Sequence, residues 1–241
     1  MTPAGDDRGP LTASRLLQLM ASRPALIVSL PSNDPDLARA AASGGADALK
    51  VHINVHHDAS GTHFGSLAEE RGAFERILSA VSIPVGIVPG SATMASRRDL
   101  DALREMGLDF FDAFAHHMPT WMLSFEGMAR VAAIDASYSP QDLPLLESLG
   151  AQAFEAAIIP HSEYATPVTV RDVARYRALC AATRRPVIVP SQRKIEPSET
   201  ALLVQQAGVR AIMIGAIVTG SEALCIERSA AAFRAALDAL G

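Results

Sequence analysis

Two lysines stand apart among the 21 basic residues of the chain, because every other basic residue is an arginine. Lys50 lies inside the apolar stretch "GGADALKVHIN", residues 44–54, and Lys194 ends the stretch "VPSQRK". A lysine is a compact ammonium whose pKa shifts on burial, so it can transfer protons, form a Schiff base or bind an anion. The bias toward arginine therefore predicts that the two lysines are functional.

The seven histidines are also concentrated, since all of them lie in or just after three short apolar segments: His52, His56, His57, His63, His116, His117 and His161. Imidazole can transfer protons near neutral pH or bind a divalent metal ion. The loop "HINVHHDASGTHFGS" matches no compact metal-ligand spacing. No metal ligand and no cofactor is therefore assigned, although a divalent ion is left open.

Short runs rich in Val and Ile, such as "ALIVSLP" and "PVIVPS", alternate eight times with amphipathic segments. Eight strand–helix units in one chain predict a single (β/α)8 TIM barrel, a fold of about 250 residues. A doubly wound open sheet is the alternative, but the chain lacks a dinucleotide-binding glycine motif. The segment "SRLLQLMAS" predicts an extra N-terminal helix under the barrel floor. We expect a flexible tail over residues 1–12 and the barrel over residues 13–241.

Side chains alternate along a strand, which predicts what faces the barrel lumen. In the second strand Leu49, Val51 and Ile53 form the apolar set that should face the helices. The residues expected to face the lumen are Lys50, His52 and Asn54, together with Ser29, Asp135, Glu155 and His161 from other strands. Asp112 is not assigned, because both faces of its strand are mixed. Active sites of such barrels lie at the C-terminal ends of the strands.

Lys50 has two interpretations at this stage. It could form a structural ion pair with Asp135 or Glu155, or it could serve the chemistry of the site. Desolvation would lower its pKa and allow proton transfer or Schiff-base formation, whereas nearby carboxylates would leave a permanent cation that binds an anionic substrate.

The end of the chain predicts a phosphate site. In "VRAIMIGAIVTGSEAL" the last strand runs into glycines that let backbone amides approach a ligand before the final helix begins. Loops after strands seven and eight are the usual phosphate site of this fold. The predicted binding residues are Ser191, Arg193, Lys194, Gly215, Ala216, Gly220 and Ser221.

Composition excludes several classes of partner. A net charge of −5 and no basic stripe argue against nucleic acid. No apolar run reaches the roughly 18–20 residues that span a bilayer, and the polar, acidic N-terminus is unlike a signal peptide. Cys180 and Cys225 have no metal-ligand spacing and are expected to be reduced. We therefore expect a cytoplasmic protein, with homo-oligomer formation left open.

Several stretches resemble the ribulose-phosphate-binding barrels, and within them N-acetylmannosamine-6-phosphate 2-epimerase most closely. These stretches are "ALIVSL", "AIDASYSPQDLPLLESLGAQAF", "HSEYATP" and "GVRAIMIGAIVTG". The resemblance implies an anion-binding or orienting role for Lys50, and phosphate contacts for Gly215, Ala216 and Arg193. The catalytic residues of that family are not retained, since Pro89 replaces the lysine that ends its third strand and "PSQRK" contains no acid.

The predicted function is an isomerase or epimerase acting on a phosphorylated sugar or a similar small metabolite. Glu155 or Asp135 would abstract a proton, and Lys50 and His52 would stabilise the oxyanion or return the proton. One alternative is a lyase or aldolase that uses Lys50 as a Schiff base or a histidine-bound metal. The other is a barrel that binds a phosphorylated metabolite without turning it over.

Overall fold

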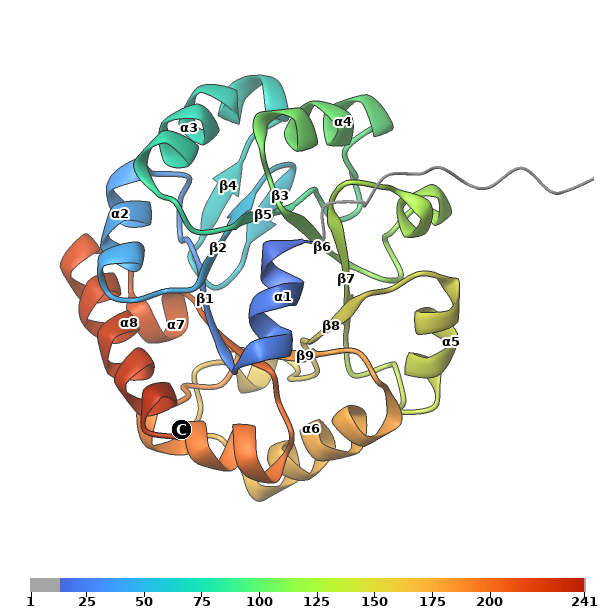
Figure 1. The fold of residues 1–241 in the computed structure, drawn as a ribbon, viewed down its shortest axis with the longest axis vertical. Helices are drawn as coiled ribbons and strands as arrows, with labels where there is room; N and C mark the ends of the chain where they lie inside the picture. The colour runs from blue at the N-terminus through green and yellow to red at the C-terminus, as the bar shows by residue number, and fades with distance from the viewer. Residues whose placement is uncertain (1–13, 241) are drawn as a thin grey trace, which may run out of the picture.

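The computed structural model describes residues 14–240, so the tail expected over residues 1–12 lies outside the described residues. Eight parallel strands close into a barrel in the order β1-β10-β9-β8-β7-β6-β5-β2 (Figure 1). This closed parallel barrel confirms the predicted (β/α)8 fold. Its strands are β1 (Ala25–Ser29), β2 (Ala48–His52), β5 (Val85–Val88), β6 (Phe110–Phe114), β7 (Ala129–Ile134), β8 (Ala153–Ala156), β9 (Val187–Pro190) and β10 (Ala211–Ile214).

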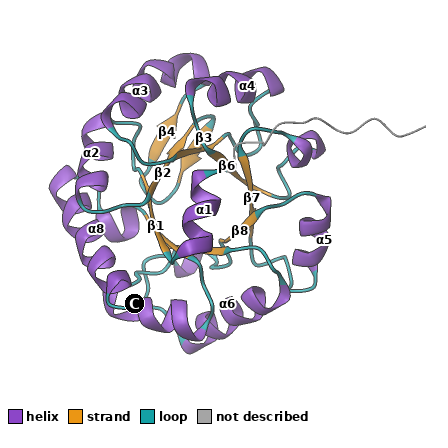
Figure 2. Cartoon of the chain, viewed as in Figure 1, coloured by secondary structure: helices purple, strands orange, loops and turns teal. Residues whose placement is uncertain are grey.

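Helices surround the barrel on its outer face (Figure 2). They are α2 (Pro35–Ser43), α3 (Leu67–Ala80), α4 (Arg97–Met106), α5 (Asp142–Leu149), α6 (Val170–Ala182) and α8 (Ala223–Asp238), with a four-residue helix α7 (Ala216–Thr219) after β10. Two segments expected to form amphipathic α-helices form shorter helices of other types. The first is a 3-10 helix at Thr120–Ser124. The second is a 3-10 helix at Pro197–Glu199, which is followed by a π-helix at Leu202–Gln206. No helix within residues 14–240 is long and apolar enough to cross a membrane.

Local sequence explains where the helices begin and end. Capping boxes start α4 and α6, in which the N-cap hydroxyls of Ser96 and Thr169 pair with the carboxylates of Asp99 and Asp172. Helix α4 then ends at Gly107, whose φ of 103° is a left-handed conformation that glycine adopts without strain. Local residues thus fix where α4 and α6 begin and where α4 ends.

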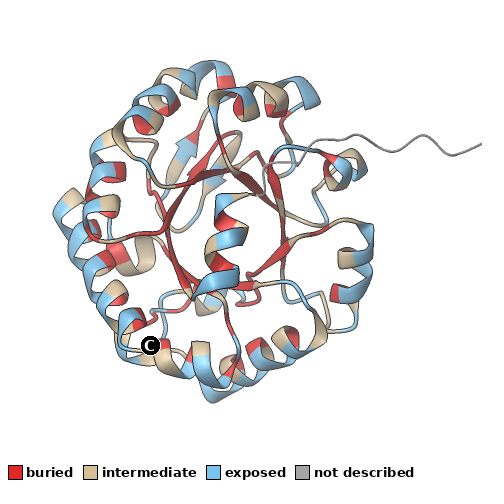
Figure 3. Cartoon of the chain, viewed as in Figure 1, coloured by how far each residue is buried: buried red, intermediate tan, exposed pale blue. Residues whose placement is uncertain are grey.

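The barrel strands are largely buried (Figure 3). The core has two layers, because alternate strand residues face the lumen and the helices. Leu16 and Met20 of helix α1 (Arg15–Ser22) enter the lumen from the N-terminal end, as the extra helix was predicted to do. At the same level, a Cβ on Gly86 would lie 2.1 Å from Cε2 of Phe110, so only glycine leaves room for that ring. The lower lumen is thus filled with apolar atoms, and polar groups remain only near the other rim.

A hairpin inserted after β2 lies at the C-terminal rim. It consists of β3 (Val55–His57) and β4 (Thr62–Phe64), which pair antiparallel. Asn54 begins it with a φ of 53°, and its side-chain amide donates to the carbonyl of Pro89 at 3.4 Å. Asn54, which alternation placed in the lumen, therefore shapes the entry to the hairpin instead, because the left-handed turn ends the strand before it.

Candidate functional site

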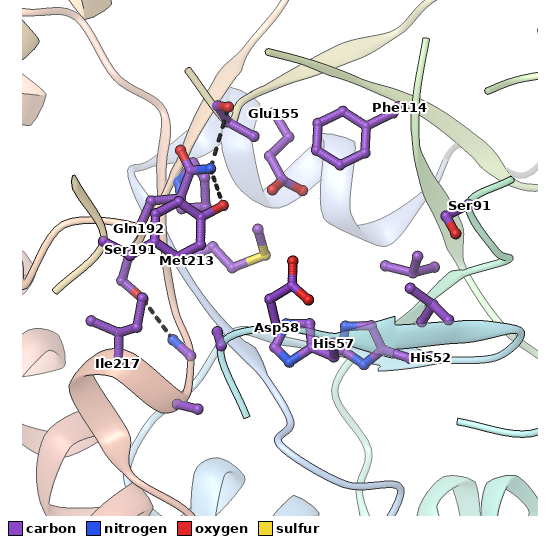
Figure 4. Close-up of a pocket in the computed structure, with 18 of the residues that line it drawn as sticks. His52, His57, Asp58, Ser91, Phe114, Glu155, Ser191, Gln192, Met213 and Ile217 are labelled. Carbon is purple, nitrogen blue, oxygen red and sulfur yellow. Dashed lines mark hydrogen bonds between the residues drawn. The ribbon is translucent and has the colours of Figure 1, made fainter. Parts of the chain in front are cut away.

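A pocket of about 200 Å³ opens at the C-terminal rim of the barrel, next to the hairpin (Figure 4). Its apolar wall includes Val88, Phe114, Met213 and Ile217. Its polar lining comes from the hairpin, from the ends of β2, β8 and β9, and from the loops after β5 and β8. It consists of His52, His56, His57, Asp58, Ser91, Glu155, Tyr164, Ser191 and Gln192. A small pocket with an apolar wall and a few convergent polar groups is typical of a ligand site.

Three charged side chains meet in the lumen beside this pocket. The ammonium of Lys50 lies 2.8 Å from Oε2 of Glu155 and 3.1 Å from Oδ2 of Asp112. The side chains come from β2, β8 and β6, and all three are buried. Glu155 lines the pocket and directs its carboxylate into it, whereas Lys50 is not among the lining residues (Figure 4). A ligand in the pocket would therefore meet the carboxylate and not the amine.

The pairing decides the charge of each group. Burial alone would lower the pKa of Lys50, but the carboxylates of Asp112 and Glu155 outweigh it and raise that pKa, so the ammonium is permanent. Burial together with the charge of Glu155 raises the pKa of Asp112 well above its usual value. Burial opposes ionisation of Glu155 too, but the charge of Lys50 outweighs it and lowers its pKa. The pKa values of the two acids thus shift in opposite directions, which favours the charged form of Glu155 over that of Asp112.

Two neutral imidazoles form another side of the pocket. His52 at the end of β2 stacks on Phe64 of the hairpin, and the His52 and His57 ring centroids are 4.7 Å apart. Burial, followed by the charge of Lys50, lowers the pKa of His57 to about 4. Burial likewise lowers the pKa of His52 well below its ordinary value. Nε2 of His52 lies 3.4 Å from the hydroxyl of Ser29, and its Nδ1 has no partner within residues 14–240.

Tyr164 supplies a phenolic hydroxyl to the pocket. The side-chain amide of Gln192 donates to this hydroxyl at 2.7 Å and to the carbonyl of Ala157 at 3.3 Å (Figure 4). The carbonyl oxygen of the same amide accepts from the backbone of Ile159, so Gln192 is held in one orientation. Because the Tyr164 oxygen is already an acceptor, its own proton is available to a ligand.

The part of the pocket next to Gln192 is made of small groups and backbone. The hydroxyl of Ser191 accepts from the amide of Gly215 at 2.8 Å, which leaves its proton free (Figure 4). In α7 the first amides to bond internally are those of Val218 and Thr219, which donate to Gly215. The amides of Ala216 and Ile217 precede them and have no partner inside the helix. The pocket thus brings together three of the residues predicted to bind a phosphate, Ser191, Gly215 and Ala216.

Four other predicted phosphate residues do not reach the pocket. The guanidinium of Arg193 is buried against acids, with its Nε 2.9 Å from Oδ2 of Asp172 and a terminal nitrogen paired with Glu163. Lys194 points to a separate surface hollow. Gly220 and Ser221 are exposed and follow α7 outside the pocket.

Two residues expected in the lumen lie on the rim. Asp135 directly follows β7, and its carboxylate accepts from the backbone amide of Ser137 at 2.9 Å and from the Ser137 hydroxyl at 2.5 Å, because the chain turns there. His161 begins a 3-10 helix after β8 and is exposed, with its Nε2 3.9 Å from Oδ2 of Asp58. Alternation fails at both positions because the strand has already ended. Asp135 is therefore replaced by Asp112 as the second acid beside Lys50.

Sequence reasoning missed Asp112, Tyr164 and Gln192. Asp112 has the same parity as Phe110, which faces the lumen, but phenylalanines on both faces of "FFDAF" hide that signal. Tyr164 and Gln192 lie in loops with no periodicity. Within residues 14–240 no group of three His, Cys, Asp or Glu side chains is placed to hold a metal ion.

The fold and the rim pocket define a (β/α)8 barrel with a polar site at the strand ends. No family model and no curated protein matches the chain. Among solved structures, tryptophan synthase of Mycobacterium tuberculosis superposes with a TM-score of 0.72 at 16% identity, covering 93% of this chain and 98% of that one.

Two further solved barrels superpose on the chain at similarly low sequence identity. Phosphoribosyl anthranilate isomerase from Thermus thermophilus gives a TM-score of 0.63 at 18% identity, covering 90% of this chain and 100% of that one. The tryptophan synthase A-subunit of Pyrococcus furiosus gives 0.62 at 14% identity, covering 88% and 99%. At these identities the likeness shows the fold alone.

Proposed function

We propose that the protein is an isomerase or epimerase that moves a proton on a small phosphorylated metabolite. The observation that carries the proposal is the ionised carboxylate of Glu155, which faces a ligand-sized pocket while Lys50 and Asp112 hold it from behind. A fixed carboxylate of this kind can act as a general base toward a carbon next to a carbonyl. The fold neighbours include an isomerase by name, which is compatible with this proposal.

Other groups around the pocket can stabilise the negative charge that develops on the substrate when the proton is removed. The hydroxyl of Tyr164 and the neutral ring of His57 are donors that can stabilise the oxygen on which negative charge develops. The pKa of Asp112 is raised beside Glu155, and the ammonium of Lys50 compensates the charge of the Glu155 carboxylate. Lys50 therefore tunes the base and does not touch the substrate in this proposal.

The phosphate would bind at the end of the pocket formed by Ser191, Gly215 and Ala216. Support comes from the free hydroxyl proton of Ser191 and the first amides of α7, which together offer donors to an anion. The pocket of about 200 Å³ is below the roughly 300–1,000 Å³ of drug-sized ligands, which favours a short carbon chain.

The lyase alternative through a Schiff base has less support. A Schiff base needs an unprotonated amine that the substrate can reach. Lys50 is held as an ammonium by two carboxylates and is not part of the pocket lining. The histidine-bound metal version lacks a group of three suitable ligands within the described part of the chain.

Solvent exchange tests the proposal directly. The protein is incubated in D2O with a panel of short aldose and ketose phosphates, and proton NMR follows deuterium entering next to the carbonyl. We expect exchange with at least one member, and its loss by a factor of about 100 or more in Glu155→Gln. Asp135→Asn is the matched control, since that acid lies on the rim and should leave the rate unchanged.

The outcomes separate the hypotheses. Binding of a panel member without exchange would support the non-catalytic barrel. Exchange that survives Glu155→Gln would remove this carboxylate from the mechanism, and exchange that stops on borohydride treatment would favour Schiff-base chemistry at a lysine.

A further inference from the structure

A second hollow lies on the outer side of α7 and contains the other lysine. It measures about 250 Å³, and its lining includes Lys194, Val218 of α7, and Arg228 and Phe233 of α8. Phe233 is buried, and Ser229 adds a hydroxyl to the lining. The hollow thus combines apolar and polar groups.

Its two cations have no partner within the described residues. The side chains of Lys194 and Arg228 are exposed, and neither forms an ion pair or a hydrogen bond within residues 14–240. Other exposed arginines, such as Arg39, pair with a nearby acid. Glu196 is the one acid that lines the hollow, so the formal charge of the lining is positive.

We propose that this hollow is a second anion site, which binds a small molecule that carries a phosphate group on an apolar body. The guanidinium of Arg228 and the ammonium of Lys194 both line the hollow and can bind the oxygens of a phosphate, while Val218 and Phe233 offer apolar contact to the rest of the molecule. This site is independent of the reaction proposed above, because it shares no lining residue with the first pocket.

The two pockets are nevertheless neighbours through α7. Ile217 lines the first pocket and Val218 lines the second, so consecutive residues of a four-residue helix face both. The segment after β9 also lines both pockets, because Gln192 lines the first pocket and Lys194 lines the second hollow. A ligand in the second hollow therefore contacts the two segments that carry Ser191 and Ala216.

Amide NMR with phenyl phosphate as the probe, and inorganic phosphate as the reference, tests the proposal. We expect saturable shifts at Lys194, Val218 and Ser229, which report the second hollow separately from shifts at Gly215 that report the first pocket. Phenyl phosphate should bind more tightly than inorganic phosphate because its ring adds apolar contact.

Variants of exposed residues test the contribution of single side chains to binding and remove no buried contact. Arg228→Ala and Lys194→Ala should each weaken phenyl phosphate about tenfold at the second hollow, the effect of one charge-assisted contact. Glu196→Gln should tighten it, and Arg98→Ala, which removes an exposed arginine elsewhere, should change nothing. Equal affinity in all four variants, or shifts confined to Gly215 and its neighbours, would overturn the proposal.

Discussion

The ammonium of Lys50 lies 2.8 Å from Oε2 of Glu155, and both side chains are buried inside the barrel. Their Cα atoms belong to strands β2 and β8, which are not neighbours in the sheet, so the pair spans the lumen. A second carboxylate, that of Asp112, approaches the same ammonium at 3.1 Å. One cation therefore compensates two acids at the floor of the candidate site.

Removal of the cation should be strongly destabilising. Lys50→Met leaves the buried acids Glu155 and Asp112 without their cation, and we expect a loss of about 3–5 kcal/mol in the free energy of unfolding. The double variant Lys50→Met with Glu155→Gln also removes the charge of Glu155 and should recover a large part of this loss. Urea denaturation of the two variants measures the difference, and equal stability would show that the pair is not coupled.

His57 should make the fold weaker in acid. Its pKa is about 4 in the folded protein against 6.5 in a model compound, because burial and Lys50 disfavour the charged ring. Between these values the unfolded chain binds more protons, so stability falls as the pH drops from 6.5 to 4. The loss from this residue reaches about 3 kcal/mol. Denaturation of the wild type and His57→Gln across this range should converge at low pH, and parallel curves would contradict the assignment.

Tyr164 should matter for ligand binding more than for stability. In Tyr164→Phe the amide of Gln192 keeps its bond to Ala157, so the free energy of unfolding should fall by only about 1 kcal/mol. Affinity for a substrate found by the exchange screen should fall about tenfold, because a donor in the pocket is lost. Calorimetric titration checks the affinity, with Tyr138→Phe as a control at a tyrosine outside the pocket.

Arg193 should be structural and not a phosphate ligand. Arg193→Met removes the partner of the buried carboxylate of Asp172, and we expect about 3–5 kcal/mol of destabilisation. Amide shifts at Gly215 and Ala216 on titration with inorganic phosphate should be the same as in the wild type. A tenfold weaker response in folded Arg193→Met would restore the phosphate role that the sequence resemblance implied.

Local pattern was enough to predict the architecture. The repeated apolar runs indicate eight strands, and alternation within "ALKVH" places Lys50 and His52 on the face opposite Leu49 and Val51. Both inferences depend on neighbours along the chain, where the geometry of a strand is fixed by its own backbone. The site at the strand ends follows from the same reasoning, since a parallel barrel brings all of those ends to one rim.

Partnerships across the barrel could not be obtained in that way. Whether Asp112 or Asp135 meets Lys50 depends on where each strand ends and on the register after closure, which no local pattern encodes. The acids that neutralise Arg193 come from a 3-10 helix and from α6, brought together only by the packed fold. By itself the sequence determined the barrel and the lumen-facing lysine, because strand period is local. Only the tertiary structure decided which charges meet, because electrostatic contacts depend on distances between segments far apart in the chain.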